Sequence, residues 1–213
     1  MPYSQFTIET VKTKFDISIS EEFGIFAEIP ESNYSDFLAQ SLREYVPLAL
    51  AVTTEKARSA FIIAPILFEL RKQFKNKISL FSGREFNVEN QKGLTGLRDF
   101  LICNSSEQLA IETPVIALVE AKNDNIQSGL GQCMAEMIAA QLFNQRNQRE
   151  AKIIYGAATT GTNWKFMRLE GKTISVDLNE YFLNNVGKLL GILKHCIESS
   201  HLSTLFPEEE RYC

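Results

Sequence analysis

The stretch PVIALVEAKNDN, residues 114–125, decides the fold because it predicts a buried strand that ends in charged residues. The run from Val115 to Val119 is apolar throughout, and Glu120 and Lys122 follow it with one alanine between them. Alternate side chains of a strand share a face at intervals of roughly 6.6 Å, so these two charges should lie side by side. Read alone, they could equally be a surface ion pair worth under about 1 kcal/mol.

Length and charge set limits on the class of protein. A chain of 213 residues can bury about 70% of the surface that it exposes when unfolded. The net charge of −4 excludes a protein coated in basic residues. The charge is uneven, however, since residues 1–47 carry eight acids and three bases and residues 48–100 carry five acids and nine bases. Arg71, Lys75 and Arg84 are therefore candidate contacts for phosphate groups, although a solvated face is the ordinary alternative.

Cysteine and histidine usage points away from export and from zinc. The four cysteines are scattered, with no close pair suited to a metal or a disulfide framework, so we expect a cytoplasmic protein. The first residues lack a signal-peptide pattern, and the apolar runs are too short to span a membrane. Only two histidines occur, both near the C-terminus, and catalysis centred on histidine is not expected.

Hydrophobic periodicity predicts an α/β fold with a mixed sheet flanked by helices. We expect an N-terminal appendage of strands and a short helix (1–50), a core (51–180) and a C-terminal helix with an acidic tail packed on the same domain (181–213). The predicted strands cover parts of 5–29 and then 77–88, 96–104, 113–122, 152–160 and 163–171. The predicted helices cover 35–46, 53–76 with a break at Pro65, 129–146 with Ser128 as N-cap, and 184–199.

Asp99 lies in the predicted strand before the opening stretch, among apolar residues. Pairing these two strands could bring Asp99 beside Glu120. Two carboxylates at about 4 Å repel each other by roughly 4 kcal/mol at an effective dielectric near 20, so a cation is needed for both to remain ionised. Hard oxygen ligands favour Mg²⁺ or Mn²⁺. The alternative is that Asp99 caps a bulge or pairs with Arg98 or Arg84.

The pattern Asp99, twenty residues, then Glu120-Ala121-Lys122 resembles the PD-(D/E)xK nuclease superfamily. TEKARSAFIIAPIL (54–67), which contains Glu55, is similar to the first helix in the nuclease domains of type I restriction subunits. GLGQCMAEM (129–137), which contains Gln132, and YGAATTGTNWKF (155–166) resemble the helix and strand pair that follow. The resemblance covers about residues 50–170 and implies a restriction-endonuclease-like core. It departs at Leu97-Arg98, where a proline often stands, and at Glu136, which replaces a tyrosine.

The resemblance implies a metal-dependent nuclease that hydrolyses phosphodiester bonds in DNA and acts as a homodimer if it cuts both strands. Mg²⁺ or Mn²⁺ would be held by Glu55, Asp99, Glu120 and the backbone carbonyl of Ala121. Lys122 and Gln132 would join Asp99 and Glu120 as catalytic residues. Glu55 has a simpler explanation, since an acid in a first helical turn is stabilised by the helix dipole. Two alternatives stay open: a catalytically silent nuclease fold used for nucleic-acid binding or assembly, and a structural α/β protein whose carboxylates lie far apart.

Overall fold

The structure is a computed structural model that describes residues 2–75, 77–149 and 151–202, without the side chains of residues 201 and 202. Its helices are α1 (Ile8–Phe15), α2 (Asp36–Val52), α3 (Glu55–Arg58), α4 (Ala64–Gln73), α5 (Gln127–Arg146) and α6 (Val186–Leu202). Its strands are β1 (Ser18–Glu22), β2 (Ser79–Glu85), β3 (Leu97–Cys103), β4 (Val115–Ala121), β5 (Ile153–Thr159), β6 (Asn163–Glu170), β7 (Thr173–Asp177) and β8 (Tyr181–Phe182). None of the helices in this described part is long and apolar enough to cross a membrane.

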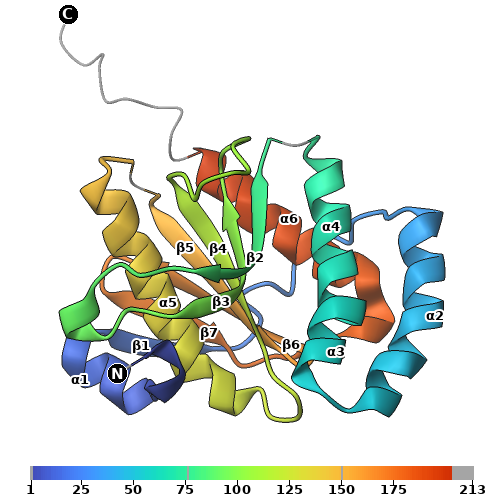
Figure 1. The fold of residues 1–213 in the computed structure, drawn as a ribbon, viewed down its shortest axis with the longest axis horizontal. Helices are drawn as coiled ribbons and strands as arrows, with labels where there is room; N and C mark the ends of the chain where they lie inside the picture. The colour runs from blue at the N-terminus through green and yellow to red at the C-terminus, as the bar shows by residue number, and fades with distance from the viewer. Residues whose placement is uncertain (1, 76, 150, 203–213) are drawn as a thin grey trace, which may run out of the picture.

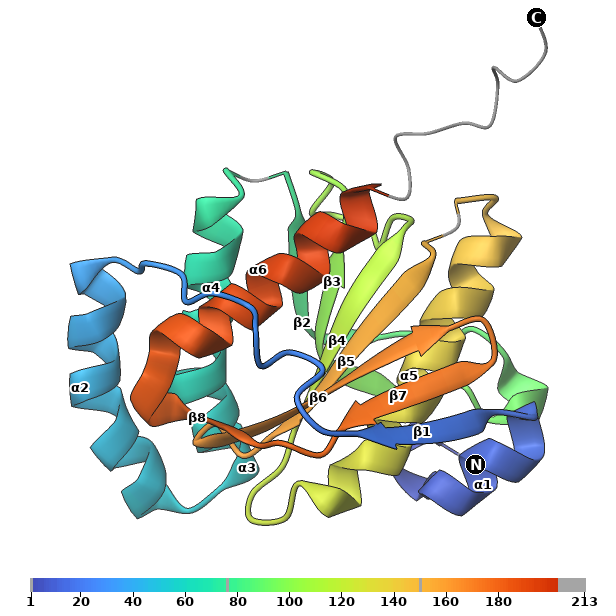
Figure 2. The ribbon, with the colours of Figure 1, turned by 180° about the vertical axis from the view of Figure 1, so that it is seen from behind.

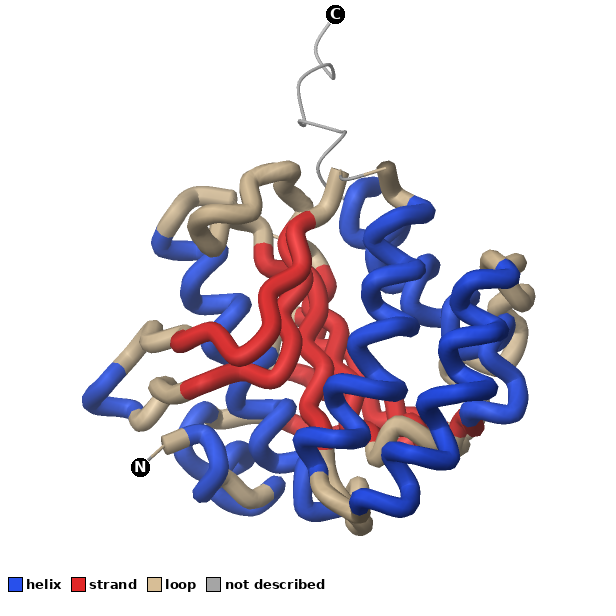
Figure 3. Tube along the Cα trace, turned by 45° about the vertical axis from the view of Figure 1, so that its right-hand side comes forward, coloured by secondary structure: helices blue, strands red, loops and turns tan. Residues whose placement is uncertain are grey.

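The strands form one mixed sheet in the order β1-β7-β6-β5-β4-β3-β2, with β8 paired to β6. Helix α5 covers one face, and α4 and α6 cover the other, with α2 outside them (Figures 1 and 2). Seen from the side, the strands form a layer between the two helical layers (Figure 3). The mixed sheet flanked by helices confirms the fold class predicted from periodicity.

Strand β4 lies in the middle of this sheet, and every one of its residues is buried. It pairs antiparallel with β3 and parallel with β5, and α5 makes the crossover between β4 and β5. A strand covered on both faces needs a continuous apolar run rather than an alternating one, which is what residues 115–119 supply. The predicted core strand is therefore confirmed. Glu120 is the last but one residue of this buried strand.

The N-terminal segment differs from its prediction as strands. Residues 8–15 form α1, which starts at a capping box between Thr7 and Thr10, and only residues 18–22 form a strand. The alternation of Phe15, Ile17 and Ile19 spans the end of the helix and the start of β1, so it imitated one longer strand. Strand β1 pairs with β7 in the central sheet, and α1 packs against α5. The predicted appendage thus contributes to the same layers as the core.

Two other boundaries differ from the sequence prediction, and two strands were missed. Ser128 lies inside α5 and is not its N-cap, because the Asn125 side chain accepts the Gln127 N–H at 2.9 Å at the helix start. Helix α2 continues through Pro47 to Val52. Strands β7 and β8 were not predicted at all. The helix expected to bend or divide at Pro65 is irregular just before that residue: a π-helical turn, Ser59–Ile63, links α3 to α4, and Pro65 lies in the first turn of α4.

The contact between α5 and the N-terminal segment gives a test of the fold. A Cβ atom at Gly131 would lie 2.5 Å from the Phe6 carbonyl oxygen and 2.6 Å from the Thr7 carbonyl carbon. Backbone atoms cannot move aside as a flexible side chain can, so we expect Gly131→Ala to lower the free energy of unfolding by about 1–3 kcal/mol. Urea denaturation measures this, with exposed Gln127→Ala on the same helix as control. An unchanged midpoint for Gly131→Ala would contradict the packing.

Candidate active site

Strand β3 changes direction at Asp99. Phe100 and Ile102 pack in the core under α4 and α6, whereas Arg98 forms an ion pair with Glu136 of α5 on the opposite face. A regular strand would place residues 98, 100 and 102 on one face. Opposite Asp99 in the register of β2 and β3 lies Gly83, whose φ of 62° interrupts the extended backbone. The bend therefore turns Asp99 out of the regular ladder.

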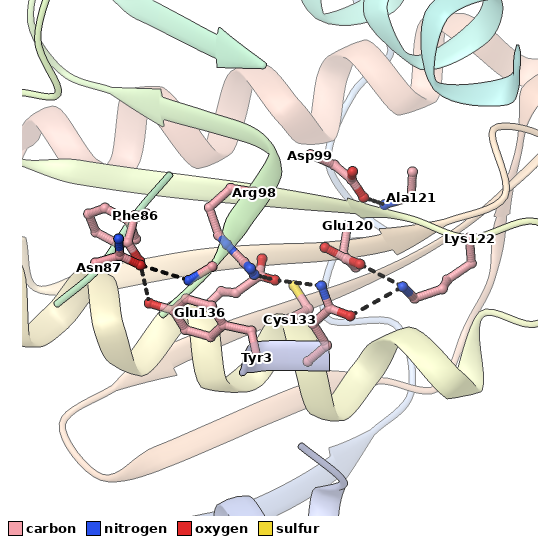
Figure 4. Close-up of polar contacts among 12 residues, drawn as sticks. Tyr3, Phe86, Asn87, Arg98, Asp99, Glu120, Ala121, Lys122, Cys133 and Glu136 are labelled. Atoms are coloured by element: carbon pink, nitrogen blue, oxygen red, sulfur yellow. Dashed lines mark hydrogen bonds and ion pairs between the residues drawn. The ribbon is translucent and has the colours of Figure 1, made fainter. Parts of the chain in front are cut away.

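The bend brings Asp99 to the end of β4. Its Oδ2 accepts a hydrogen bond of 2.8 Å from the Ala121 N–H, in place of a backbone partner (Figure 4). The last pair of the β3–β4 register is Phe100 with Val119, and one further step sets Asp99 against Glu120. The charge of Asp99 also raises the pKa of Glu120. The convergence of these two acids, predicted from strand pairing, is therefore present.

Glu120 is a buried acid with one uncompensated oxygen. Its side chain is 2% exposed, and its Oε1 accepts a 2.6 Å hydrogen bond from the Lys122 ammonium. Its Oε2 is buried and has no hydrogen-bond partner among the described residues. Burial first, and Asp99 second, raise the pKa of Glu120 to about 7, although the charges of Lys122 and Arg98 act the other way. A cation at Oε2 would offset this cost.

Lys122 lies on the same side as Glu120, as its position two residues later predicts. Its stem runs over Gly129, where a Cβ would approach the Lys122 Cγ to 3.0 Å, so a glycine leaves room for it. The Lys122 ammonium also donates to the Gln132 Oε1 at 3.3 Å. Burial alone would lower the pKa of Lys122, but the nearby carboxylates, Glu120 foremost, outweigh burial and raise it. Lys122 is therefore held as a cation.

Two buried charges that sequence reasoning missed stand behind this group. The Gln132 Nε2 donates to the Glu136 Oε1 at 3.1 Å, and the same oxygen pairs with Arg98. Arg98 in turn lies over the Tyr3 ring, 3.8 Å from its centroid. Figure 4 shows the polar contacts of these residues between β3 and α5. The four-residue spacing of Gln132 and Glu136 on a helix was the available signal.

The residues that converge here match the chemistry of a hard divalent ion. Asp99 and Glu120 offer carboxylate oxygens, and the unpartnered Glu120 Oε2 is one of them. Among the described residues, no group of three or more His, Cys, Asp or Glu side chains is close enough together to hold a metal ion. Glu55 is coupled to the site through the charges of Lys122 and Asp99. Its pKa is raised, mainly by burial and also by Asp99, although Lys122 acts to lower it. The fit therefore rests on two carboxylates, and ligation by Glu55 or by the Ala121 carbonyl stays a prediction.

The three bases predicted to contact phosphates do not lie together. Helix α4 leads into the start of β2, which pairs with the end of β3. The end of β3 pairs with the start of β4, so α4 finishes at the end of the sheet where β4 starts. Arg71 and Lys75 therefore lie at the end of the sheet opposite to the end that carries Lys122. They are too far to touch the phosphates on either side of one held at Asp99. Arg84 pairs with Arg98 in the β2–β3 ladder and therefore lies at the same end of the sheet as Asp99.

A cavity lies beside the segment that follows Lys122, residues 123–127. It measures about 300 Å³, and its lining includes one base, Arg58, and two acids, Asp124 and Glu180. The Arg58 Nη1 donates to the Thr160 carbonyl at 3.0 Å, which ties α3 to the end of β5. Because β5 runs parallel to β4, this end is also the end that carries Lys122. Arg58, which sequence reasoning did not select, is thus a base at the end of the sheet that carries Lys122.

Comparison with known proteins finds no matching family model, no matching curated protein and no matching solved structure. The interpretation of the site therefore depends on its own geometry.

The raised pKa of Glu120 predicts how stability depends on pH. The folded state binds the Glu120 proton more tightly than the unfolded chain does. The contribution of Glu120 to stability is therefore fully present below about pH 4.5 and is lost as the pH rises through 7. Glu120→Gln keeps the shape of the neutral side chain. Its free energy of unfolding, relative to that of the wild type, should therefore rise by up to about 3 kcal/mol between pH 4.5 and pH 8. Urea denaturation in a metal chelator measures this difference. A difference that stays constant with pH would show that Glu120 is not buried beside a second negative charge.

Proposed function

We propose that the protein is a metal-dependent nuclease that hydrolyses phosphodiester bonds in DNA, within a restriction-endonuclease-like core. The observation that carries the proposal is the buried, unpartnered oxygen of Glu120 beside Asp99, with the Lys122 ammonium next to both. An acid pair in which one buried oxygen has no partner among the described residues favours a cation, and an ammonium held beside it suits a substrate whose transition state gains negative charge.

The chain's own residues have separate roles in this reaction. Asp99 and Glu120 would hold Mg²⁺ or Mn²⁺, which when bound would neutralise charge on the scissile phosphate and lower the pKa of a water. Lys122 orients the attacking water and stabilises the charge that develops on the phosphate oxygens. The water oxygen forms the new bond to phosphorus and its proton passes to solvent. The bond to the leaving oxygen breaks, and that oxygen takes up a proton from solvent. Gln132 keeps the ammonium in place.

Arg58 and Arg84 support a polyanionic substrate at this site. Arg58 is in α3 and Arg84 is in β2, and both lie at the end of the sheet where β4 finishes. Contacts of arginine to flanking phosphates would fix the position of a strand without reading its bases.

Cleavage of DNA in the presence of Mn²⁺ tests the proposal. We expect the wild type to cut plasmid or single-stranded DNA, and Lys122→Ala to cut at least about 10²-fold more slowly while DNA binding persists, because the lysine acts on the transition state. Lys75→Ala, at the opposite end of the sheet, is the matched control and should cut at the wild-type rate.

The same assay separates the alternative function. Wild-type protein that binds DNA but cuts no nucleic acid with any divalent ion would favour a silent nuclease fold used for binding or assembly. A Lys122→Ala variant that cuts as fast as the wild type would remove the role given to the lysine.

A further inference from the structure

We infer that Glu136, held by Arg98, is a positioning residue that orients the Gln132 amide and through it the Lys122 ammonium. The inference rests on the proposed function for the role of Lys122, but its geometry is independent of any metal. It involves two residues outside the acid and lysine set, on β3 and α5, which Figure 4 shows on the α5 side of the sheet.

The Gln132 amide has a defined direction. A glutamine side chain has one end that donates and one end that accepts. Its Nε2 faces the Glu136 carboxylate, which in an ion pair can only accept, and its Oε1 faces the Lys122 ammonium, which can only donate. The two charges therefore specify the same orientation of Gln132. If either charge is removed, the amide can rotate by half a turn and present donors to Lys122.

Glu136 carries a buried charge. Its side chain is 0% exposed, and an unpaired carboxylate there would be costly. Arg98, itself 3% exposed, provides the opposite charge. The Tyr3 ring covers the guanidinium, and the Tyr3 hydroxyl donates to the Phe86 carbonyl at 3.0 Å, which fixes that ring. The N-terminal turn thus closes the pair off from solvent.

The same arrangement holds the Lys122 ammonium. The ammonium has three donors and a flexible stem, and Glu120 alone would hold it by one bond. The Gln132 oxygen adds a second anchor from a different element, α5. Two anchors at different angles restrict where the ammonium can point. A buried ion pair seldom adds net stability over an apolar pair of similar size, so a positional role gives it a function.

The test uses a variant that preserves folding. Glu136→Gln alone would leave Arg98 buried and unpaired, so we use Arg98→Met with Glu136→Leu, an apolar pair of similar volume that should be at least as stable as the wild type. The readout, in metal-free protein, is the exchange rate of the Lys122 ammonium hydrogens with water, measured by NMR with ¹⁵N-labelled lysine. We expect faster exchange in the double variant. Gln132→Met should show the same increase, and adding it to the double variant should cause no further change.

Activity supplies the second readout. In a wild type that cleaves DNA, the double variant should lose about 10- to 100-fold in kcat, as is typical for groups that support a functional residue, with KM for DNA unchanged. A folded double variant with wild-type exchange at Lys122, or an effect additive with Gln132→Met, would overturn the inference. A wild type that does not cleave removes the proposed function, but the exchange measurement still decides whether Glu136 positions Lys122.

Discussion

The repulsion between Asp99 and Glu120 is the constraint on which this site depends. Glu120 is buried at the end of a central strand, and its Oε2 has no partner among the described residues. Asp99 is brought to the same place by a bend in β3 and is anchored there by the Ala121 N–H. Such an arrangement costs stability, and native proteins in general are only marginally stable. Burial raises the pKa of Glu120 accordingly. Local cost of this kind is commonly retained where it serves a function.

The rest of the fold keeps the acids and Lys122 in a fixed relation. Strand β4 is covered by helices on both faces, so its end cannot shift without disturbing the core. Helix α5 begins at Gln127, after a short loop from Lys122, and it presents first the glycine that accommodates the lysine stem and then Gln132 and Glu136. Arg98 connects that helix to the bend in β3. The acids, the lysine and their supports therefore come from two adjacent strands and one helix.

The centre of this arrangement could be predicted from sequence, but its support could not. The two-residue period of a strand puts Glu120 and Lys122 on one side, and pairing of neighbouring strands brings Asp99 near them. Arg98 with Glu136 was missed because their contact depends on the bend at Asp99, which strand periodicity does not contain. Arg71 and Lys75 were placed wrongly because charge counts along a sequence do not give the direction in which α4 runs.

The central claim is that Asp99 and Glu120 together form a site for a divalent cation. Diffraction from a crystal soaked in Mn²⁺, with the anomalous signal of the metal, tests it most directly. The account predicts a peak between the two side chains, in contact with oxygens of both and with the Glu120 Oε2 among its ligands. Clear density for the side chains with no peak between them at high Mn²⁺ concentration would contradict it.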